Sequence, residues 1–152
     1  MEQLLKMVGQ IKRKNRLKIF LLTISFVIIA IFITYQLYPT PSKTVRHFFT
    51  YLMREEYVKA YNLIDGKYKE KRGSLEKFSD EYRKAVEGGT RTKEVRITGI
   101  EKTKEPNKVI IDVTVRALYF GDLIDTNGKY VVEKIKGKGW KIVDNVSLTQ
   151  SK

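Results

Sequence analysis

Few residues in this chain could support chemistry, and one carboxylate stands out among them. In the segment WKIVDNVSL, apolar side chains alternate as in a strand with one apolar face, and Asp144 falls on the same face as Trp140 and Ile142. A carboxylate buried on such a face is poorly hydrated, which raises its pKa and makes it a candidate general base. The alternative is that Asp144 is solvated and pairs with a nearby lysine. The single tryptophan, Trp140, is interpreted as closing the core rather than as the wall of a catalytic pocket.

The remaining composition excludes several kinds of site. The chain has no cysteine and one histidine, His47, which the helical period places on the solvent side of its segment. Disulfides, thiolate metal sites, cysteine nucleophiles and multi-histidine centres are therefore excluded. GDLIDTNGK does not match the spacing of a calcium-binding loop, and no glycine loop for phosphate or serine nucleophile motif occurs. We assign no catalytic, cofactor-binding or metal-ligating residue, expect no cofactor, and predict that the protein is not an enzyme.

The distribution of charge divides the 152 residues into parts. The net charge is +13, yet no charged side chain occurs between Ile19 and Ser42. Ile19 to Tyr38 is a run of twenty apolar or weakly polar residues, which as a helix would measure about 30 Å, the thickness of a bilayer's hydrocarbon core. We predict a transmembrane helix at residues 19–38 that holds the chain in the lipid bilayer.

The flanks of this apolar run predict its orientation. Residues 1–18 form a basic tail, and cations concentrate on the cytoplasmic side of a membrane helix. The tail is therefore expected in the cytoplasm as part of a single-pass signal-anchor, with the rest of the chain outside. A cleaved signal peptide is the alternative, but the bulky residues and prolines of TYQLYPTPSK do not fit a cleavage site. The tail residues expected to meet anionic lipid headgroups are Lys12, Arg13, Lys14, Arg16 and Lys18.

A Pro-containing linker at residues 39–43 is predicted to lead into a folded domain at residues 44–149. Its first half has helical periodicity. Ser42 is expected to cap a first helix, a second covers YVKAYNLI and ends at Gly66, and Ser74 caps a third, with a basic loop between the last two. The apolar stripe of the first helix comprises Val45, Phe48, Phe49 and Leu52.

After residue 90 the apolar period changes from 3.6 to 2, which predicts about four antiparallel strands. Gly99 is expected at a bulge in the first strand, because Val95 and Ile97 are out of step with Ile100. DTNG, at residues 125–128, is a strong hairpin-turn sequence, and GKG precedes the last strand. The fold class is therefore α+β, with an N-terminal transmembrane helix followed by three helices packed on a curved antiparallel sheet of about four strands.

Three segments carry a family resemblance: SKTVRHFFTYLMREEYVKAYNLI, the helix that begins SLEKF, and VIIDVTVRALYFGDLIDTNGKYVVEKIKGKGWKIVD. Residues 42 to about 148 resemble the nuclear transport factor 2-like (cystatin-like) superfamily, in particular the non-catalytic N-terminal domain of penicillin-binding transpeptidases and small membrane-anchored bacterial relatives. The resemblance implies that Trp140 packs between sheet and helices. Enzymes of the superfamily work in the pocket between these layers, where Asp144 would be the acid–base candidate. The sequence departs from the transpeptidases in one respect, since we expect no catalytic domain.

These observations give an expected function. The chain is interpreted as a bacterial plasma-membrane protein whose extracytoplasmic domain acts as a binding or scaffold accessory in a cell-envelope or secretion assembly. The alternatives are a scaffold subunit of a type IV secretion (conjugation) system, whose plan is similar, and a small-molecule-binding or enzymatic pocket domain that uses Asp144.

Two basic clusters of the domain bear on its partners. One lies between the second and third helices and the other around the last turn; besides envelope proteins, they suit an anionic cell-wall polymer or lipid headgroups, unless they are simply a solvated surface. Nucleic acid is not expected, because the aromatic residues belong to helix stripes rather than alternating with the basic ones. The clusters comprise Lys67, Lys69, Lys71 and Arg72, and Lys134, Lys136, Lys138 and Lys141.

Overall fold

The computed structural model describes Phe20, residues 22–31 and residues 39–150, the last five of these by their backbone. The chain divides into two compact units, residues 1–38 and 39–152. In the first unit, residues 22–31 are helical and apolar side chains such as Phe26 are exposed. Among the described residues, no helix is long and apolar enough to cross a membrane. The other positions of the predicted span, residues 19, 21 and 32–38, lie outside the described part of the chain.

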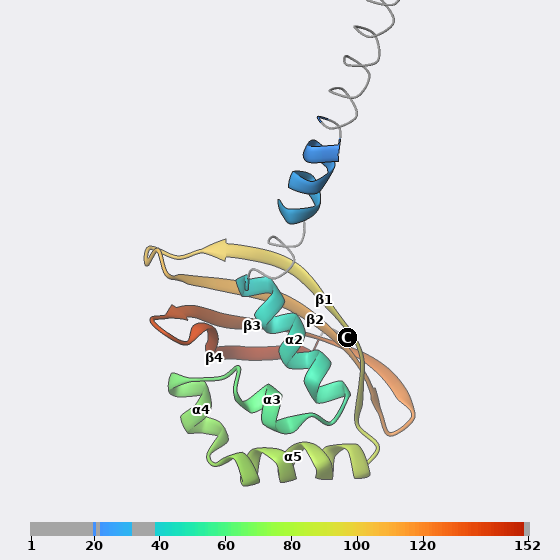
Figure 1. The fold of residues 1–152 in the computed structure, drawn as a ribbon. Helices are drawn as coiled ribbons and strands as arrows, with labels where there is room; N and C mark the ends of the chain where they lie inside the picture. Colours follow the sequence, from blue (N-terminus) through green and yellow to red (C-terminus); the bar gives the residue numbers. More distant parts are fainter. Residues whose placement is uncertain (1–19, 21, 32–38, 151–152) are drawn as a thin grey trace, which may run out of the picture. The chain divides into compact units, whose positions relative to one another are not determined.

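The second unit contains one four-stranded antiparallel sheet in which sequential strands are neighbours (Figure 1). The strands are β1 (Arg91–Lys102), β2 (Lys108–Tyr119), β3 (Asp122–Ile135) and β4 (Gly139–Gln150). The predicted bulge at Gly99 is confirmed, since the β1–β2 register shifts between Ile97 and Gly99. A Cβ on Gly99 would lie 2.6 Å from an Asp112 side-chain oxygen, so a larger residue there would require the Asp112 side chain to move.

The predicted hairpin turn at Asp125–Gly128 is wrong. These residues lie within β3, where Asn127 accepts a hydrogen bond from the Thr114 hydroxyl at 2.7 Å. The chain turns instead at Phe120 and Gly121, both with positive φ (48° and 98°), as a two-residue type I′ hairpin requires. This position lets β2 and β3 pair continuously from Lys108–Glu133 to Tyr119–Asp122, and the long ladder outweighs the local preference of Asn-Gly for a turn.

Four helices precede the sheet: α2 (Pro41–Met53), α3 (Tyr57–Tyr61), α4 (Gly66–Arg72) and α5 (Leu75–Glu87). Ser74 caps α5 as predicted, by accepting a hydrogen bond from the Lys77 amide. Helix α2 is capped by Thr40 rather than by the predicted Ser42. Proline suits the first position of a helix, so α2 begins at Pro41, earlier in the chain than predicted.

The basic loop predicted after Gly66 is in fact helix α4. It has one apolar anchor, Tyr68, which is almost completely buried, and Asp65 caps its start by accepting a hydrogen bond from the Gly66 amide. A single buried ring in a short lysine-rich segment gives no apolar stripe, so periodicity could not reveal this helix.

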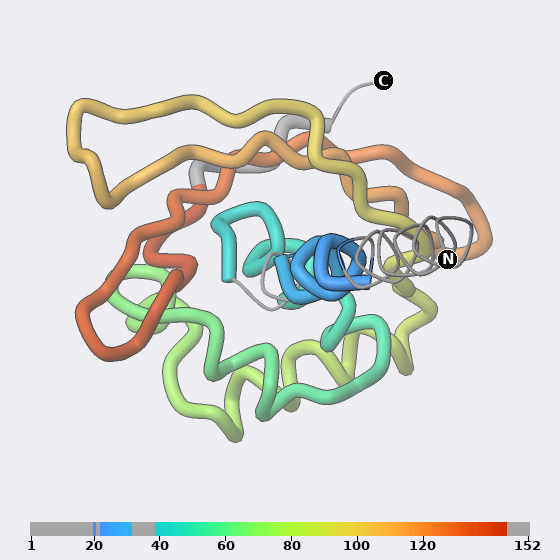
Figure 2. Tube along the Cα trace, turned by 45° about the horizontal axis from the view of Figure 1, so that its top comes forward, coloured from blue at the N-terminus to red at the C-terminus, as the bar shows by residue number. Residues whose placement is uncertain are grey.

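Helix α2 lies between the sheet and the pair α3 and α5, as the turned view makes plain (Figure 2). Its predicted stripe is confirmed: Val45, Phe48, Phe49 and Leu52 are all buried. The fully buried Phe48 ring is the centre of this arrangement. Its centroid lies 6.1 Å from that of Tyr68 in α4, 6.4 Å from Phe78 in α5 and 6.5 Å from Tyr130 in β3.

A short segment before α4 covers part of the free edge of β4. The Asp65 amide donates to the Ile142 carbonyl at 2.9 Å, and the Ile142 amide donates to the Leu63 carbonyl at 2.9 Å. Ile64 thereby forms an isolated parallel bridge with Ile142, and both side chains are buried.

The central position of Phe48 makes a stability prediction. Phe48→Ala leaves a cavity among rings from three other elements and is expected to lower the free energy of unfolding by about 3–5 kcal/mol. Urea denaturation of the full-length chain followed by circular dichroism measures this. Val58→Ala, at an exposed position of α3, is the control and should change the free energy by less than about 0.5 kcal/mol. Equal losses in the two variants would contradict the central role of Phe48.

Candidate binding site

Asp144 does not occupy the buried position that strand alternation predicted. The β3–β4 register shifts by one residue, so that Val132 pairs with Ile142 but Val131 pairs with Asp144. Because β4 carries this extra residue, Asp144 leaves the face of Ile142. Its carboxylate lies 2.7 Å from the Lys71 Nζ and is 28% exposed. The hydrogen bond from Lys71 lowers the pKa of Asp144, so the expected raised pKa is wrong and the solvated, lysine-paired alternative is correct.

The structure also shows the positions of two other residues singled out in the sequence, His47 and Trp140. His47 is exposed, as predicted. Trp140 is half-buried and packs against the core, which agrees with its interpretation as a structural residue.

The space between sheet and helices is occupied by aromatic side chains, some of them polar. Burial raises the pKa of the Tyr130 phenol and that of the Tyr82 phenol. Arg72 donates to the Tyr68 hydroxyl at 3.2 Å and stacks over the rings of Tyr68 and Tyr82. From the sequence, Arg72 is predicted to belong to a basic surface cluster. Its neighbouring residues give no indication that it contacts buried rings. The phenols are therefore held neutral within the core.

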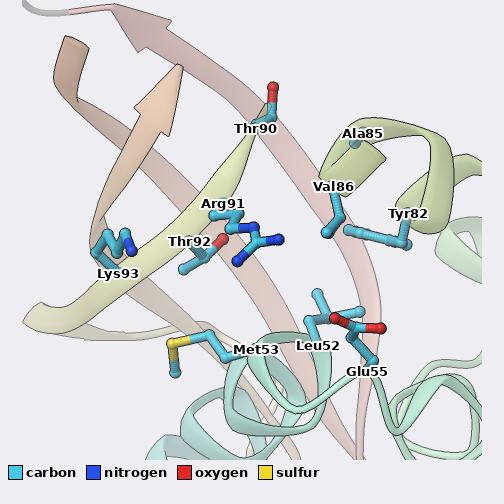
Figure 3. Close-up of a pocket in the computed structure, with 10 residues that line it drawn as sticks. All are labelled: Leu52, Met53, Glu55, Tyr82, Ala85, Val86, Thr90, Arg91, Thr92 and Lys93. Carbon is cyan, nitrogen blue, oxygen red and sulfur yellow. The ribbon is translucent and has the colours of Figure 1, made fainter. Parts of the chain in front are cut away.

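A cavity of about 290 Å³ opens where α2 ends, between α5 and the start of β1 (Figure 3). Leu52, Ala85 and Val86 give it an apolar part, and Figure 3 shows Arg91 extending from β1 toward its middle, with Glu55 on the opposite side. Sequence reasoning did not find this cavity, because its residues come from three segments that carry no common motif.

One wall of the cavity contains a strained residue. Glu55 has φ 59° and follows α2 in a Schellman arrangement, in which its amide donates to Leu52 and the Glu56 amide donates to Tyr51. Glycine is the usual residue at this position, and a side chain there costs roughly 1 kcal/mol. The strained turn places the Glu55 carboxylate at the rim of the cavity.

The tip of the β2–β3 hairpin is an exposed apolar feature beside this cavity. Tyr119, Phe120 and Leu123 are 49%, 73% and 64% exposed. The tip is close to the cavity because Arg91 pairs with Leu118 at the end of β2. The cavity and the hairpin tip therefore form one edge of the domain, which we call the binding edge. Large apolar side chains held in water at one place are typical of an interaction surface.

The arrangement of elements is shared with proteins of known structure. Similar structures include a ketosteroid isomerase-like protein from Erwinia carotovora atroseptica (TM-score 0.53, 7% identity, 69% of this chain and 89% of that one) and a cystatin-like domain of unknown function from Nostoc punctiforme (0.52, 16%, 73% and 77%). A calcium/calmodulin-dependent protein kinase type II association domain from Thiobacillus denitrificans is similar as well (0.54, 11%, 76% and 98%). No protein-family model matches the chain, and no curated protein matches it in sequence.

These similarities confirm the expected fold. The domain has the nuclear transport factor 2-like, or cystatin-like, fold. At such low identities the likeness concerns the fold alone, and one fold can host unrelated functions. What the chain does must be argued from its own surface and interior.

The ion pair of Asp144 predicts a pH dependence. A carboxyl whose folded-state pKa is depressed stabilises the fold above its unfolded pKa of about 3.9, and this contribution is lost as the pH falls from that value through the lower folded-state pKa. Asp144→Asn, which can still accept the bond from the Asn145 amide, should therefore lower the free energy of unfolding at pH 7 by about 0.5–1 kcal/mol.

Urea denaturation at pH 7 and pH 3 measures the effect, and the difference from the unmodified chain should be smaller at pH 3 than at pH 7. Asp122→Asn removes an exposed carboxylate and serves as the matched control, with no change above about 0.5 kcal/mol at either pH. A difference for Asp144→Asn that is as large at pH 3 as at pH 7 would show that the loss comes from packing and not from the ion pair.

Proposed function

We propose that this protein is a membrane-anchored scaffold or accessory subunit whose domain binds a protein partner of the bacterial cell envelope, or of a secretion assembly, through the binding edge. The observation that carries the proposal is the hairpin tip, where two aromatic residues and a leucine are presented to solvent on a strained turn. The turn requires a positive φ at Phe120, which costs a residue other than glycine roughly 1 kcal/mol. The exposed Phe120 side chain lowers solubility and is unfavourable in this turn. Its presence is therefore best explained by contact with a partner.

The interior of the domain supports binding rather than catalysis. The rings of Phe48, Phe78 and Tyr130 fill the region between α2, α5 and the sheet. Asp144, the acid–base candidate from the sequence, is held ionised by Lys71. The cavity beside Arg91 is of a size that suits a side chain or a short segment of a partner, and its mixed lining suits recognition of a peptide.

Membrane anchoring completes the proposal. The uncharged run from Ile19 to Tyr38 and the cations before it favour a cytoplasmic tail and an extracytoplasmic domain. In this arrangement the domain would meet envelope partners outside the membrane. The shared fold also occurs in a protein named as an association domain, so a non-enzymatic role is compatible with it.

Site-specific photocrosslinking tests the binding edge. A benzoylphenylalanine at position 120 of the full-length chain in intact membranes should form a discrete adduct with one envelope protein, because the ring it replaces is the most exposed of the hairpin. The control is the same probe at Lys104, an exposed residue of the β1–β2 turn at the other end of the sheet. Adducts of equal yield and identity at both positions, or no adduct at position 120, would overturn the proposed binding edge.

The anchored orientation has a separate test. Protease added to spheroplasts should degrade the domain while a cytosolic marker protein stays intact, and the protein should leave the membrane fraction only with detergent. Protection of the domain, or its recovery among soluble cytosolic proteins, would refute the anchoring and leave the result of the crosslinking experiment unaffected.

A further inference from the structure

The two basic clusters of the domain, about 70 residues apart in the sequence, come together in the fold. Leu63 and Asp65 pair with Ile142 of β4, which brings α4 against that strand. Three side-chain contacts hold the junction: the Lys138 ammonium lies 2.8 Å from Asp65, Lys141 donates to the Asn62 carbonyl, and Lys71 pairs with Asp144 as described above. The lysines of α4 and those of the β3–β4 turn therefore share one surface.

We call this surface the basic face and define it by six lysines. Four carboxylates lie at or beside it: Asp65, Glu70, Asp144 and Glu133, the cross-strand neighbour of Lys141. They do not balance the six lysines, and Asp65 and Asp144 are already paired with Lys138 and Lys71. The pKa of Lys141 is lowered chiefly by burial; Asp65 raises it, and the nearby charges of Lys138 and Lys69 lower it further. The basic face comprises Lys67, Lys69, Lys71, Lys136, Lys138 and Lys141.

Arg72 does not belong to the basic face, because its guanidinium stacks on Tyr68 and Tyr82. The cations that remain are all lysines, which are strongly hydrated point charges without the planar fork of arginine. Such groups bind phosphate by charge and by single hydrogen bonds rather than by fixed bidentate geometry. A surface of spaced lysines therefore fits a flexible ligand with repeated negative charges.

The apolar side chains of the domain argue against a membrane as that ligand. Among the described residues of the domain, the exposed large apolar side chains are Met53, Val58, Ile100, Tyr119, Phe120 and Leu123. None of them lies in α4 or in the β3–β4 turn, so the basic face offers no apolar group to enter a bilayer. No exposed aromatic ring in these two elements is available to stack on nucleobases either, and Tyr68 is buried.

We propose that the basic face binds a linear, water-soluble polymer with phosphate groups along its length and no bases. The surface joins two segments that are separate in the sequence, and its cations exceed its carboxylates. The inference does not rest on the binding edge or on the membrane anchor, because the residues of the basic face belong to other elements.

Binding of long-chain polyphosphate, used as the probe, tests the proposal by fluorescence anisotropy with the full-length chain in a zwitterionic detergent. The six cationic side chains of the tail (Lys6, Lys12, Arg13, Lys14, Arg16 and Lys18) are replaced by Gln in every protein compared, so that no basic side chain of the tail contributes to binding. Combined Lys67→Gln, Lys69→Gln and Lys136→Gln should then weaken binding at least about tenfold at low salt and reduce the dependence of the affinity on salt.

The matched control removes the same charge elsewhere, through Lys77→Gln, Lys84→Gln and Lys93→Gln at exposed positions of α5 and β1. It should change the affinity by less than about twofold. Equal losses in both triple variants would show that only net charge matters and would overturn the proposal, as would no loss in either. Binding to phosphatidylglycerol vesicles or to single-stranded DNA that is tighter than to polyphosphate, and that depends on the same three lysines, would overturn the choice of ligand in favour of a membrane or a nucleic acid.

Discussion

The contact of the Phe48 ring with rings from α4, α5 and β3 is the interaction on which the domain depends. It joins the central helix to elements on both of its sides, so that α2 serves as the core for the sheet and for the outer helices together. A helix that packs on two sides needs a wide apolar stripe, and the buried stripe of α2, with Val45 and Phe48 completely buried, provides it, while Arg46 and His47 remain exposed. The same packing leaves the middle of the domain filled with rings.

A filled interior places the features suited to recognition at the periphery. The binding edge lies where α2 ends and the β2–β3 hairpin turns, and the basic face lies where α4 meets β4. The two surfaces differ in character, one apolar with strained turns and one cationic and hydrated. Each is built from segments distant in the sequence, so that the sheet and α2 act as a frame that holds them in fixed positions.

Sequence reasoning succeeded where a structure is fixed by local periodicity. A few neighbouring residues determine each of the features that were predicted correctly: the stripe of α2, the Ser74 cap, the bulge at Gly99 and the four antiparallel strands. The predictions failed where the pairing of strands distant in the sequence determines the structure. Asn127 and Gly128 form a favourable turn by themselves, but the β2–β3 ladder absorbs them. One extra residue in β4 reverses the alternation that would have buried Asp144.

The candidate site was harder to predict than the fold for the same reason. The cavity draws on α2, α5 and β1, and the basic face requires a helix that only Tyr68 anchors. No periodic signal marks a surface assembled from such fragments. The positive charge of the two basic clusters could be read from the sequence. Their proximity in the fold could not, because it depends on the pairing of Ile64 with Ile142.

That bridge also affects how copies of the domain meet one another. A sheet with unpaired outer strands invites other chains to add strands, and growth in both directions leads to fibres. Here Leu63–Asp65 pairs with part of the free edge of β4, and the outer strand on the other side, β1, carries charged side chains at Arg91, Lys93, Glu94 and Arg96. With one side covered and the other charged, crowding of many copies should favour separate domains over open-ended stacking.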